Sequence, residues 1–157
     1  MKLIIGSDKS GFILKEVIKG WLQSENIPYR EIGTLNPEQG VPFFKVAPEA
    51  VKAIQAGEAE QAILICGTGM GMSQVANCYK GMRAACVESV YAARMCRAIN
   101  DSNILCMGGW VIGPEMGLEM AKVFLKTGFT EGLEAWRKEF LEGARKEFAA
   151  LEDTIYQ

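Results

Sequence analysis

The centre of the chain reads Ala62-Ile63-Leu64-Ile65-Cys66-Gly67-Thr68-Gly69-Met70-Gly71-Met72-Ser73, an apolar run that ends abruptly in a cysteine and three glycines. The pattern predicts a buried strand, a glycine-rich turn and the start of a helix. At the end of a parallel strand, the side chain of Cys66 would face a crevice, and backbone N–H groups of the turn would point at an anion. The alternative is that Cys66 is a small buried hydrophobe and that the glycines only make a tight turn.

The composition of the 157-residue chain fits one globular domain with a core of its own. Hydrophobic residues make up 49% of the sequence, an ordinary share for such a domain. The chain has 19 acidic and 17 basic residues, which give a formal net charge of -2, and its Lys and Arg residues are scattered. We therefore expect no nucleic-acid partner, and a small molecule or another protein instead.

Cysteine and histidine usage limits the chemistry. The chain has five cysteines, none in a Cys-x-x-Cys pair, and no histidine, so a zinc site would need widely separated thiolates. We expect no metal and no cofactor, and acid–base catalysis would fall to Cys, Asp, Glu, Lys, Tyr or water. The odd cysteine count, the lack of an export signal and the lack of an apolar run of about 18 to 20 residues predict a cytoplasmic protein without a membrane span.

Apolar runs alternate with helical patterns along most of the chain. Strands are expected at residues 3–5, 27–33, 62–66, 83–87 and 103–109, and helices at 12–22, 42–56, 73–79, 89–99 and 114–127. Pro48 leaves two starts open for the second helix, near Pro42 or at Pro48 itself. The alternation, with short connections, predicts an α/β fold with a doubly wound, five-stranded parallel sheet rather than a barrel.

Asp8 and Lys9 follow the first expected strand, at the end where open α/β sheets bind their ligands. Alternatively, Asp8 caps the next helix and Lys9 is a solvated charge in its first turn. The remaining cysteines are expected to be small buried residues: Cys78, Cys86, Cys96 and Cys106.

The tail differs from the rest of the chain. The apolar positions of residues 131–157 are Trp136, Phe140, Ala144, Phe148, Leu151 and Ile155. They step by three or four residues along one face, opposite charged side chains, which predicts an amphipathic helix after a domain of residues 1–130. Its apolar face would pack either on its own domain or on a second subunit.

Several segments together resemble one known family. In chain order they are Gly6-Ser7-Asp8-Lys9-Ser10-Gly11-Phe12, Leu14-Lys15, Gly33-Thr34, residues 65–73, Ala76-Asn77, Gly81-Met82-Arg83-Ala84, Tyr91, Ala93-Arg94, residues 100–105 and Val111-Ile112-Gly113-Pro114. From residue 1 to about 130, the chain resembles the type B ribose-5-phosphate isomerase and galactose-6-phosphate isomerase family. The cysteine–glycine loop and the Asn-Asp-x-Asn segment are the specific motifs.

The resemblance implies a Rossmann-like, three-layer α/β/α fold and a homodimer with its sites at the subunit interface, with pairing into a tetramer left open. It also implies aldose–ketose isomerisation without metal, in which Cys66 moves a proton through a cis-enediolate and the loop from Gly67 to Gly71 holds the oxyanion. Preorganised N–H donors stabilise such an oxyanion, and the same field favours a thiolate. The expected catalytic residues are Cys66, Thr68 and Asp8, and the expected substrate contacts are Lys9, Gly67, Gly69, Met70, Gly71, Ser73, Asn100, Trp110 and Arg137.

The chain departs from the family pattern at polar positions of the site. Histidines of the family correspond to Lys9, Glu88 and Ile99, and the histidine before Asn100 is associated with opening the sugar ring. Without that histidine, either ring opening is uncatalysed or falls to another group, or the substrate is never cyclic.

Arginines expected for a phosphate correspond to Trp110 and Leu133, whereas Arg137 matches one of them. Arg137 with Lys9 would still be a workable anion site. Trp110 would either stack on the C–H face of a sugar or fill the volume that an arginine vacated. These changes predict a short-chain or open-chain sugar phosphate, or a sugar or sugar acid that lacks phosphate.

We therefore expect an aldose–ketose isomerase of a small sugar or sugar phosphate, with Cys66 as the base and an altered substrate preference. The alternative is a noncatalytic sugar-binding or partner subunit, since the family includes assemblies of two related chains and this chain lacks histidine. A nucleotide-binding domain is disfavoured, because residues 67–71 lack the GxGxxG spacing and no Walker lysine follows.

Overall fold

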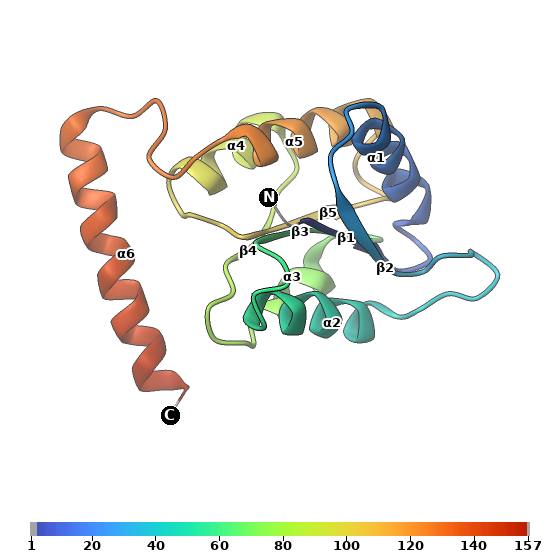
Figure 1. Ribbon diagram of the computed structural model, residues 1–157, viewed down its shortest axis with the longest axis horizontal. Helices are drawn as coiled ribbons and strands as arrows, with labels where there is room; N and C mark the ends of the chain where they lie inside the picture. The colour runs from blue at the N-terminus through green and yellow to red at the C-terminus, as the bar shows by residue number, and fades with distance from the viewer. Residues whose placement is uncertain (1–2, 157) are drawn as a thin grey trace.

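The computed structural model describes residues 3–156 and contains a five-stranded, wholly parallel sheet. Its strands are β1 (Leu3–Ser7), β2 (Tyr29–Gly33), β3 (Gln61–Cys66), β4 (Ala84–Cys86) and β5 (Ile104–Gly108). They lie in the order β2-β1-β3-β5-β4 (Figure 1). The predicted five-stranded parallel sheet is confirmed. Residues 1–2 of the expected domain (1–130) and residue 157 of the expected tail (131–157) lie outside the described residues.

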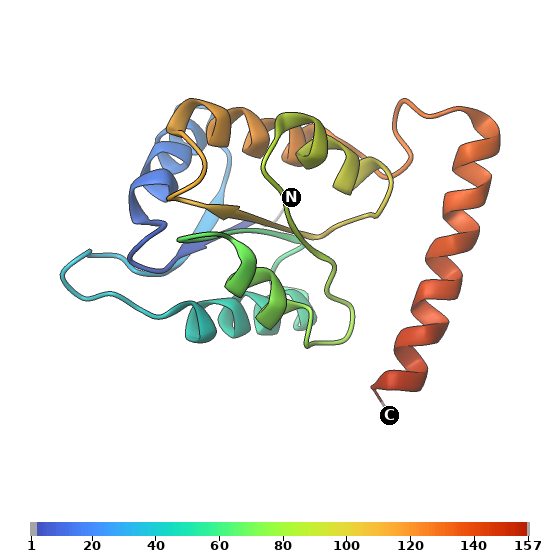
Figure 2. The same ribbon diagram turned by 180° about the vertical axis from the view of Figure 1, so that it is seen from behind.

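Helices cover both faces of the sheet. They are α1 (Phe12–Ser24), α2 (Phe43–Gln55), α3 (Met70–Ala76), α4 (Val90–Ala98), α5 (Pro114–Lys126) and α6 (Ala135–Ile155). One face carries α1, α4 and α5, and the other carries α2 and α3 (Figure 1 and Figure 2), so the expected three-layer α/β/α architecture is confirmed. Among the helices of residues 3–156, none combines the length and apolar character needed to cross a membrane.

Strand β3 lies at the centre of the core because it is apolar on both faces. All six of its residues are buried. Ile63 and Ile65 belong to the apolar cluster beneath α1, α4 and α5, and Leu64 belongs to the cluster beneath α2 and α3. Burial of each such side chain contributes about 1.5 to 3 kcal/mol. The position of Cys66 is therefore fixed by a strand that is packed along its whole length.

The winding of the chain switches between the neighbouring strands β1 and β3. Strand β1 continues into α1 on one face of the sheet, whereas β3 continues into α3 on the other face. In open parallel sheets, such a switch point leaves a crevice outside the carboxyl ends of the two strands. Asp8 follows one of these ends and Cys66 forms the other.

Two helices differ from their expected bounds. Helix α3 begins at Met70 rather than at residue 73, because Gly69 turns the chain with a φ of 79° and the helix follows directly. Helix α2 begins at Phe43 and runs through Pro48. The proline removes one backbone hydrogen bond, and the helix continues because its residues on both sides of the proline are buried against the sheet.

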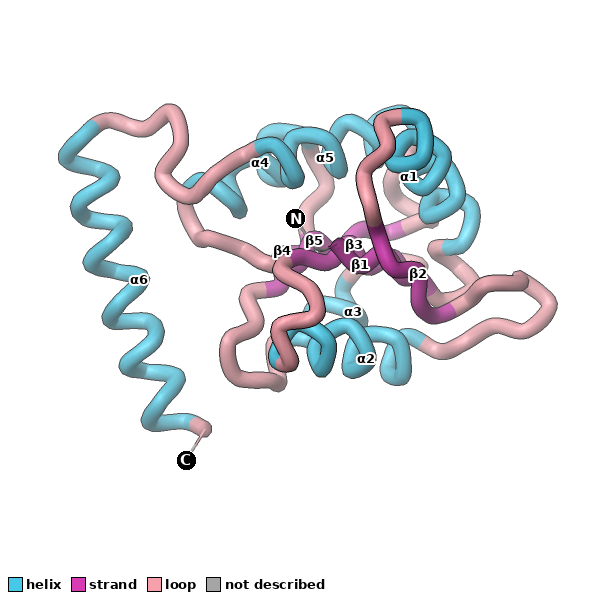
Figure 3. Tube along the Cα trace, viewed as in Figure 1, coloured by secondary structure: helices cyan, strands magenta, loops and turns pink. Residues whose placement is uncertain are grey.

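The predicted C-terminal helix is confirmed as α6, which stands beside the sheet domain (Figure 1 and Figure 3). Within α6, which is described throughout, only Leu141 is buried, and most of the large apolar side chains are exposed. Polar contacts join α6 to its own domain: Arg145 Nε donates to Asp101 at 3.3 Å, and the N–H of Gly81 donates to Glu152 at 3.0 Å. The apolar stripe of the helix is therefore largely open within one chain.

Candidate active site

Three strand ends meet at one side of the sheet. The N–H of Asp8 donates to the carbonyl of Ile65 at 3.1 Å, which joins the ends of β1 and β3. The N–H of Gly109 donates to the carbonyl of Cys66 at 2.7 Å, which joins β3 to the loop after β5. The loops after β1, β3 and β5 therefore lie together at the carboxyl ends of the strands, where open parallel sheets bind their ligands, and we call this region the crevice.

The thiol of Cys66 is held in place by the turn that precedes α3. Its Sγ accepts a hydrogen bond from the N–H of Gly69 at 3.1 Å, and the residue is only 4% exposed. Gly69 has a φ of 79°, and an added Cβ would lie 2.9 Å from the carbonyl carbon of Met107 and 3.0 Å from Sγ of Cys86, so the turn requires glycine. The sulfur is therefore held at a fixed position beside a backbone donor at the start of α3.

The same turn presents further donors. The first N–H groups of a helix have no partner within the helix, and in α3 they include those of Met70 and Gly71. The hydroxyl of Thr68 lies 3.4 Å from the nitrogen of Met70, a weak contact that leaves it available to a ligand. Donors fixed beside a thiol can stabilise an oxyanion that forms on the neighbouring atom of a substrate.

Two expected substrate contacts in α3 are partly covered. The ring of Phe43 lies against Gly71, where an added Cβ would be 2.8 Å from Cε2. The hydroxyl of Ser73 donates to the carbonyl of Met70 at 3.0 Å, and Ser73 is buried. The side chain of Met70, in contrast, is 52% exposed. Within α3, Met70 is therefore the most open of the expected contacts.

Asp8 shapes the loop between β1 and α1. Its Oδ1 accepts hydrogen bonds from the N–H groups of Ser10 at 2.8 Å and Gly11 at 3.0 Å, which form a turn before the helix. The N-cap of α1 is Gly11, which has no side-chain cap, so the alternative that Asp8 caps this helix is wrong. Burial raises the pKa of the Asp8 carboxyl, although the donors at Gly11 and Ser10 oppose the shift. Within residues 3–156, Oδ2 accepts no hydrogen bond, so Asp8 orders the loop and keeps one oxygen for a ligand.

Lys9 is exposed and packs along Gly40, where an added Cβ would lie 3.1 Å from the Cβ of Lys9. The loop that contains Gly40 is closed by Thr34, whose hydroxyl accepts the N–H of Val41 at 2.9 Å. The fully buried ammonium of Lys15 donates to the carbonyl of Thr34 and to Glu31. Sequence reasoning missed this support, and its signal was a lysine on the apolar face of α1.

Trp110 covers the cysteine loop from the side of β5. Its backbone N–H donates to the carbonyl of Gly67 at 3.0 Å. Three carbons of its six-membered ring lie 2.6 to 2.8 Å from the position that a Cβ on Gly67 would take. The side chain is nevertheless 75% exposed, so it stands as a wall at the mouth of the crevice.

Asn100 and Arg137 are not brought to this crevice within one chain. Asn100 precedes β5 at the amino end of the sheet, whereas Cys66 pairs with the last residue of that strand, Gly108. Five strand residues separate these two levels by about 16 Å. Arg137 lies in the first turn of α6, beside the sheet domain.

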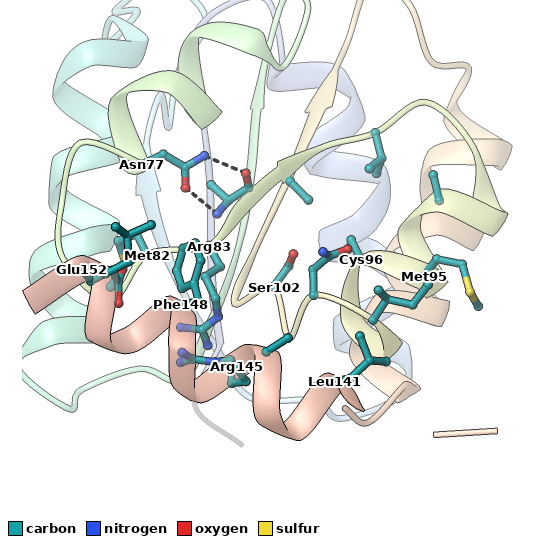
Figure 4. Close-up of a pocket in the computed structure, with 18 of the residues that line it drawn as sticks. Asn77, Met82, Arg83, Met95, Cys96, Ser102, Leu141, Arg145, Phe148 and Glu152 are labelled. Carbon is teal, nitrogen blue, oxygen red and sulfur yellow. Dashed lines mark hydrogen bonds between the residues drawn. The ribbon is translucent and has the colours of Figure 1, made fainter. Parts of the chain in front are cut away.

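Asn100 instead lines an apolar groove of about 870 Å³ between the sheet domain and α6. In Figure 4, Leu141 and Phe148 extend from α6 toward this groove, and Met95 extends toward it from α4. At its edge, Arg83 Nη2 donates to Asp101 at 3.1 Å, beside the contact from Arg145. The groove runs along the edge strand β4, from Arg83 before the strand to Val87 after it.

The expected burial of the remaining cysteines is wrong for two of them. Cys78 is exposed because it lies in the turn after α3, and Cys86 is half-buried at the end of β4, whereas Cys96 and Cys106 are buried. Sγ of Cys86 lies 3.6 Å from the carbonyl oxygen of Thr68, and burial, with added charge from Cys66, raises the pKa of its thiol. Among residues 3–156, no three acidic, cysteine or histidine side chains form a group suited to a metal ion.

The chain is similar to several known isomerases. The family model described as Ribose/Galactose Isomerase matches residues 3–140. The chain is 59% identical over 157 residues to the 4-deoxy-4-sulfo-D-erythrose isomerase of Clostridium sp. (strain MSTE9), covering 100% of this chain and 99% of that protein. It is 33% identical to the D-erythrulose-4-phosphate isomerase 2 of Mycolicibacterium smegmatis, over 82% of this chain and 86% of that protein. The solved structure of Clostridium thermocellum ribose-5-phosphate isomerase B matches with a TM-score of 0.88 and 32% identity, covering 99% of both chains.

Proposed function

Because the chain belongs to the ribose/galactose isomerase family and is an aldose–ketose isomerase of a small sugar, we propose that its substrate is 4-deoxy-4-sulfo-D-erythrose and that Cys66 moves the proton. The observation that carries the substrate is the 59% identity, over the whole chain, to an isomerase of that sugar. The role of Cys66 is supported by the contact of 3.1 Å between its sulfur and the N–H of Gly69.

The proposed substrate accounts for the missing ring-opening histidine. In 4-deoxy-4-sulfo-D-erythrose, carbon 4 carries sulfur instead of a hydroxyl, and closure through the hydroxyl of carbon 3 would give a four-membered ring. The sugar therefore has no five-membered ring to open, in keeping with Ile99 before Asn100 and with a chain that contains no histidine. The same reasoning applies to a four-carbon sugar 4-phosphate, which is the closest competing substrate.

The charge at the crevice favours a sulfonate over a phosphate ester. A sulfonate carries one negative charge, whereas a phosphate monoester carries about 1.5 to 2 at pH 7. Lys9 supplies one positive charge near the crevice, Trp110 supplies none, and Asp8 would repel an anion. Arg137 of a second copy would add one further positive charge, which leaves a small net positive charge. A single negative charge on the substrate needs less compensation than two.

In the proposed reaction, the thiolate of Cys66 removes the proton from carbon 2 of the aldose. The electron pair of that C–H bond forms the C1–C2 double bond of a cis-enediolate, and the carbonyl pair moves to oxygen 1, where N–H groups at Met70 and Gly71 stabilise the charge. Oxygen 1 then takes up a proton while oxygen 2 loses one, an exchange for which Oδ2 of Asp8 is available. The sulfur returns its proton to carbon 1, which gives the 2-ketose with no atom gained or lost.

The experiment that tests this function compares Cys66→Ala with Cys86→Ala, a change to a neighbouring thiol that takes no part in the proposed reaction. The wild type should isomerise 4-deoxy-4-sulfo-D-erythrose and exchange the hydrogen at carbon 2 with deuterium from D2O. Removing a general base lowers rates by about 100 to 10,000-fold, so Cys66→Ala should lose turnover and exchange while its circular dichroism spectrum is unchanged. Turnover by Cys66→Ala within tenfold of Cys86→Ala would exclude Cys66 as the base, and a wild type without exchange would favour a noncatalytic sugar-binding subunit.

A homodimer is the proposed active form, with Asn100 and Arg137 of one copy completing the crevice of the other. Two features support it: these residues lie away from Cys66 within one chain, and the groove beside Asn100 is apolar and open. The exposed stripe of α6 adds apolar surface that a second copy would cover.

Mixing two inactive variants tests this arrangement. Cys66→Ala and Asn100→Ala should each be inactive alone. After the two are unfolded together and refolded at equal amounts, half of the dimers should be mixed and each mixed dimer should contain one intact site, so about a quarter of wild-type activity should return. No recovery, in a mixture that sediments as dimers, would place Asn100 in the crevice of its own chain or outside the site.

A further inference from the structure

Trp110 combines a fixed position with an open face. The backbone N–H of Trp110 donates to the carbonyl of Gly67 at 3.0 Å. The backbone N–H groups of Val111 and Ile112 both donate to the carbonyl of Gly108, at 3.1 and 2.9 Å. The indole rests on Gly67, so its inner face is held by the backbone of the cysteine loop. With 75% of the residue exposed, the outer face of the ring is free to contact whatever enters the crevice.

The loop that carries the indole, residues 109–113, contains no polar or charged side chain. Val111 is 49% exposed and Met70 is 52% exposed. The arginines of the described chain that form ion pairs at the other end of the sheet, Arg83, Arg97 and Arg145, are bound to Asp101. The side of the crevice formed by the loop after β5 therefore offers hydrocarbon and aromatic surface to the substrate.

A sulfonate and a phosphate ester meet such a surface differently. In the sulfonate, sulfur is bonded directly to a methylene carbon and carries one charge, so an apolar wall can contact the methylene without removing water from a doubly charged group. A phosphate ester places an additional oxygen and about one more charge at this position, and withdrawing that charge from water without a cation is costly. An indole offers no compensating charge, whereas an arginine would offer two parallel N–H donors.

On this basis, and resting on the proposed function, we infer that Trp110 is a specificity-determining residue: its indole selects a four-carbon sugar sulfonate over the corresponding sugar phosphate. The side chain packs against the methylene that bears the sulfur and keeps the wall free of the positive charge that a phosphate requires. Because the indole rests on Gly67 and has no group that takes up or releases a proton at neutral pH, it acts on the choice of substrate rather than on proton transfer.

The experiment measures kcat/KM for 4-deoxy-4-sulfo-D-erythrose and for D-erythrose 4-phosphate. The proteins are the wild type, Trp110→Arg, Trp110→Phe and, as a matched change in the same loop, Val111→Ala. The wild type should prefer the sulfonate by at least about tenfold, which corresponds to about 1.4 kcal/mol. Trp110→Arg should move the ratio of the two kcat/KM values at least about 100-fold toward the phosphate, mainly through KM, because a bidentate cation is added where the ring stood. Trp110→Phe and Val111→Ala should move it less than about threefold.

A folded Trp110→Arg variant whose ratio moves less than threefold would overturn the inference while leaving the proposed function intact. An equal shift in Trp110→Phe would also overturn it, because the phenyl ring preserves the apolar wall. If the wild type converts only the phosphate, with exchange that depends on Cys66, then the proposed substrate fails and the inference fails with it. Should Trp110→Arg not fold, Trp110→Lys carries the same expectation with a smaller shift.

Discussion

Replacing Gly69 with alanine should damage both the fold and the reaction. Gly69 lies in the left-handed region with a φ of 79°, and its N–H donates to the sulfur of Cys66 at 3.1 Å. An added methyl group would lie 2.9 Å from the backbone of Met107 and 3.0 Å from Sγ of Cys86. Backbone atoms of a buried strand cannot yield as a flexible side chain can, so the turn itself has to move.

The size of the effect follows from two contributions. The left-handed conformation costs an alanine about 1 to 2 kcal/mol, and forcing a methyl group into a packed site costs about 1 to 3 kcal/mol. The free energy of unfolding should therefore fall by about 2 to 5 kcal/mol in total, which lowers Tm by about 4 to 20 °C at 2 to 4 °C per kcal/mol. Displacement of the donor by a few tenths of an ångström or more should lower kcat by about 10 to 100-fold.

Gly57→Ala is the matched control. Gly57 has a φ of 73°, and nothing lies within 4 Å of the position of an added Cβ, so this variant carries the conformational cost alone. It should lower Tm by about 2 to 8 °C and leave kcat unchanged. Thermal unfolding at one fixed protein concentration and a steady-state isomerase assay measure both quantities. A Gly69→Ala protein that is as stable as Gly57→Ala and keeps kcat within twofold of the wild type would refute the role given to this turn.

Three further outcomes follow from the packing and the ion pairs. Burial alone would raise the pKa of Glu31, but hydrogen bonds from Lys15 and Lys19 lower it below its ordinary value of 4.5. The Glu31 carboxylate therefore stabilises the fold above pH 4.5, and this contribution is lost as the pH falls through the lower pKa of the folded state. Glu31→Gln should reduce the loss of stability in acid, as measured by urea unfolding between pH 3 and 7. Phe124→Ala should lower the free energy of unfolding by about 3 to 5 kcal/mol, because the ring is fully buried between the helices and the sheet; a loss below 1 kcal/mol would contradict the packing. Arg145→Gln should change the free energy of unfolding by less than about 1 kcal/mol, since its ion pair with Asp101 is partly exposed. Limited proteolysis should nevertheless cleave the segment before α6 faster in this variant than in the wild type. Equal cleavage rates would show that Arg145 does not hold the helix against the domain.

The fold was predictable because each strand and helix carries its own local pattern. The run from Ala62 to Cys66 is apolar at every position, as a strand covered on both faces requires, and the sheet contains it as expected. The start of α3 was misplaced because glycine is a poor helix former, and residues 67–71 alternate glycine with other residues. In the structure, Gly69 ends the turn and Met70 already belongs to the helix.

The candidate site was predictable only where its residues follow strand ends. Cys66 forms such an end, and Asp8 and Trp110 follow one, so parallel topology brings them together. Cys86 reaches the same crevice by the same rule, but an isolated cysteine in an apolar strand gave no sign of it. Asn100 and Arg137 carry motif-like signals, yet sequence alone does not say at which end of the sheet, or in which copy of the chain, a motif is used.

Some contacting residues of the crevice are close in the sequence and others are far apart, and this spacing affects how substrate preference can change in evolution. The sulfur of Cys66 meets its N–H donor three residues later, within one short turn. The indole that covers this turn arrives from residue 110, in a loop that follows a different strand. The residues proposed for proton transfer and for the wall of the crevice are thus encoded in separate segments of the gene. If the two proposed roles hold, a single codon change in the loop after β5 would alter which sugar is accepted and leave the cysteine turn as it is, so a new substrate would need only one mutational step.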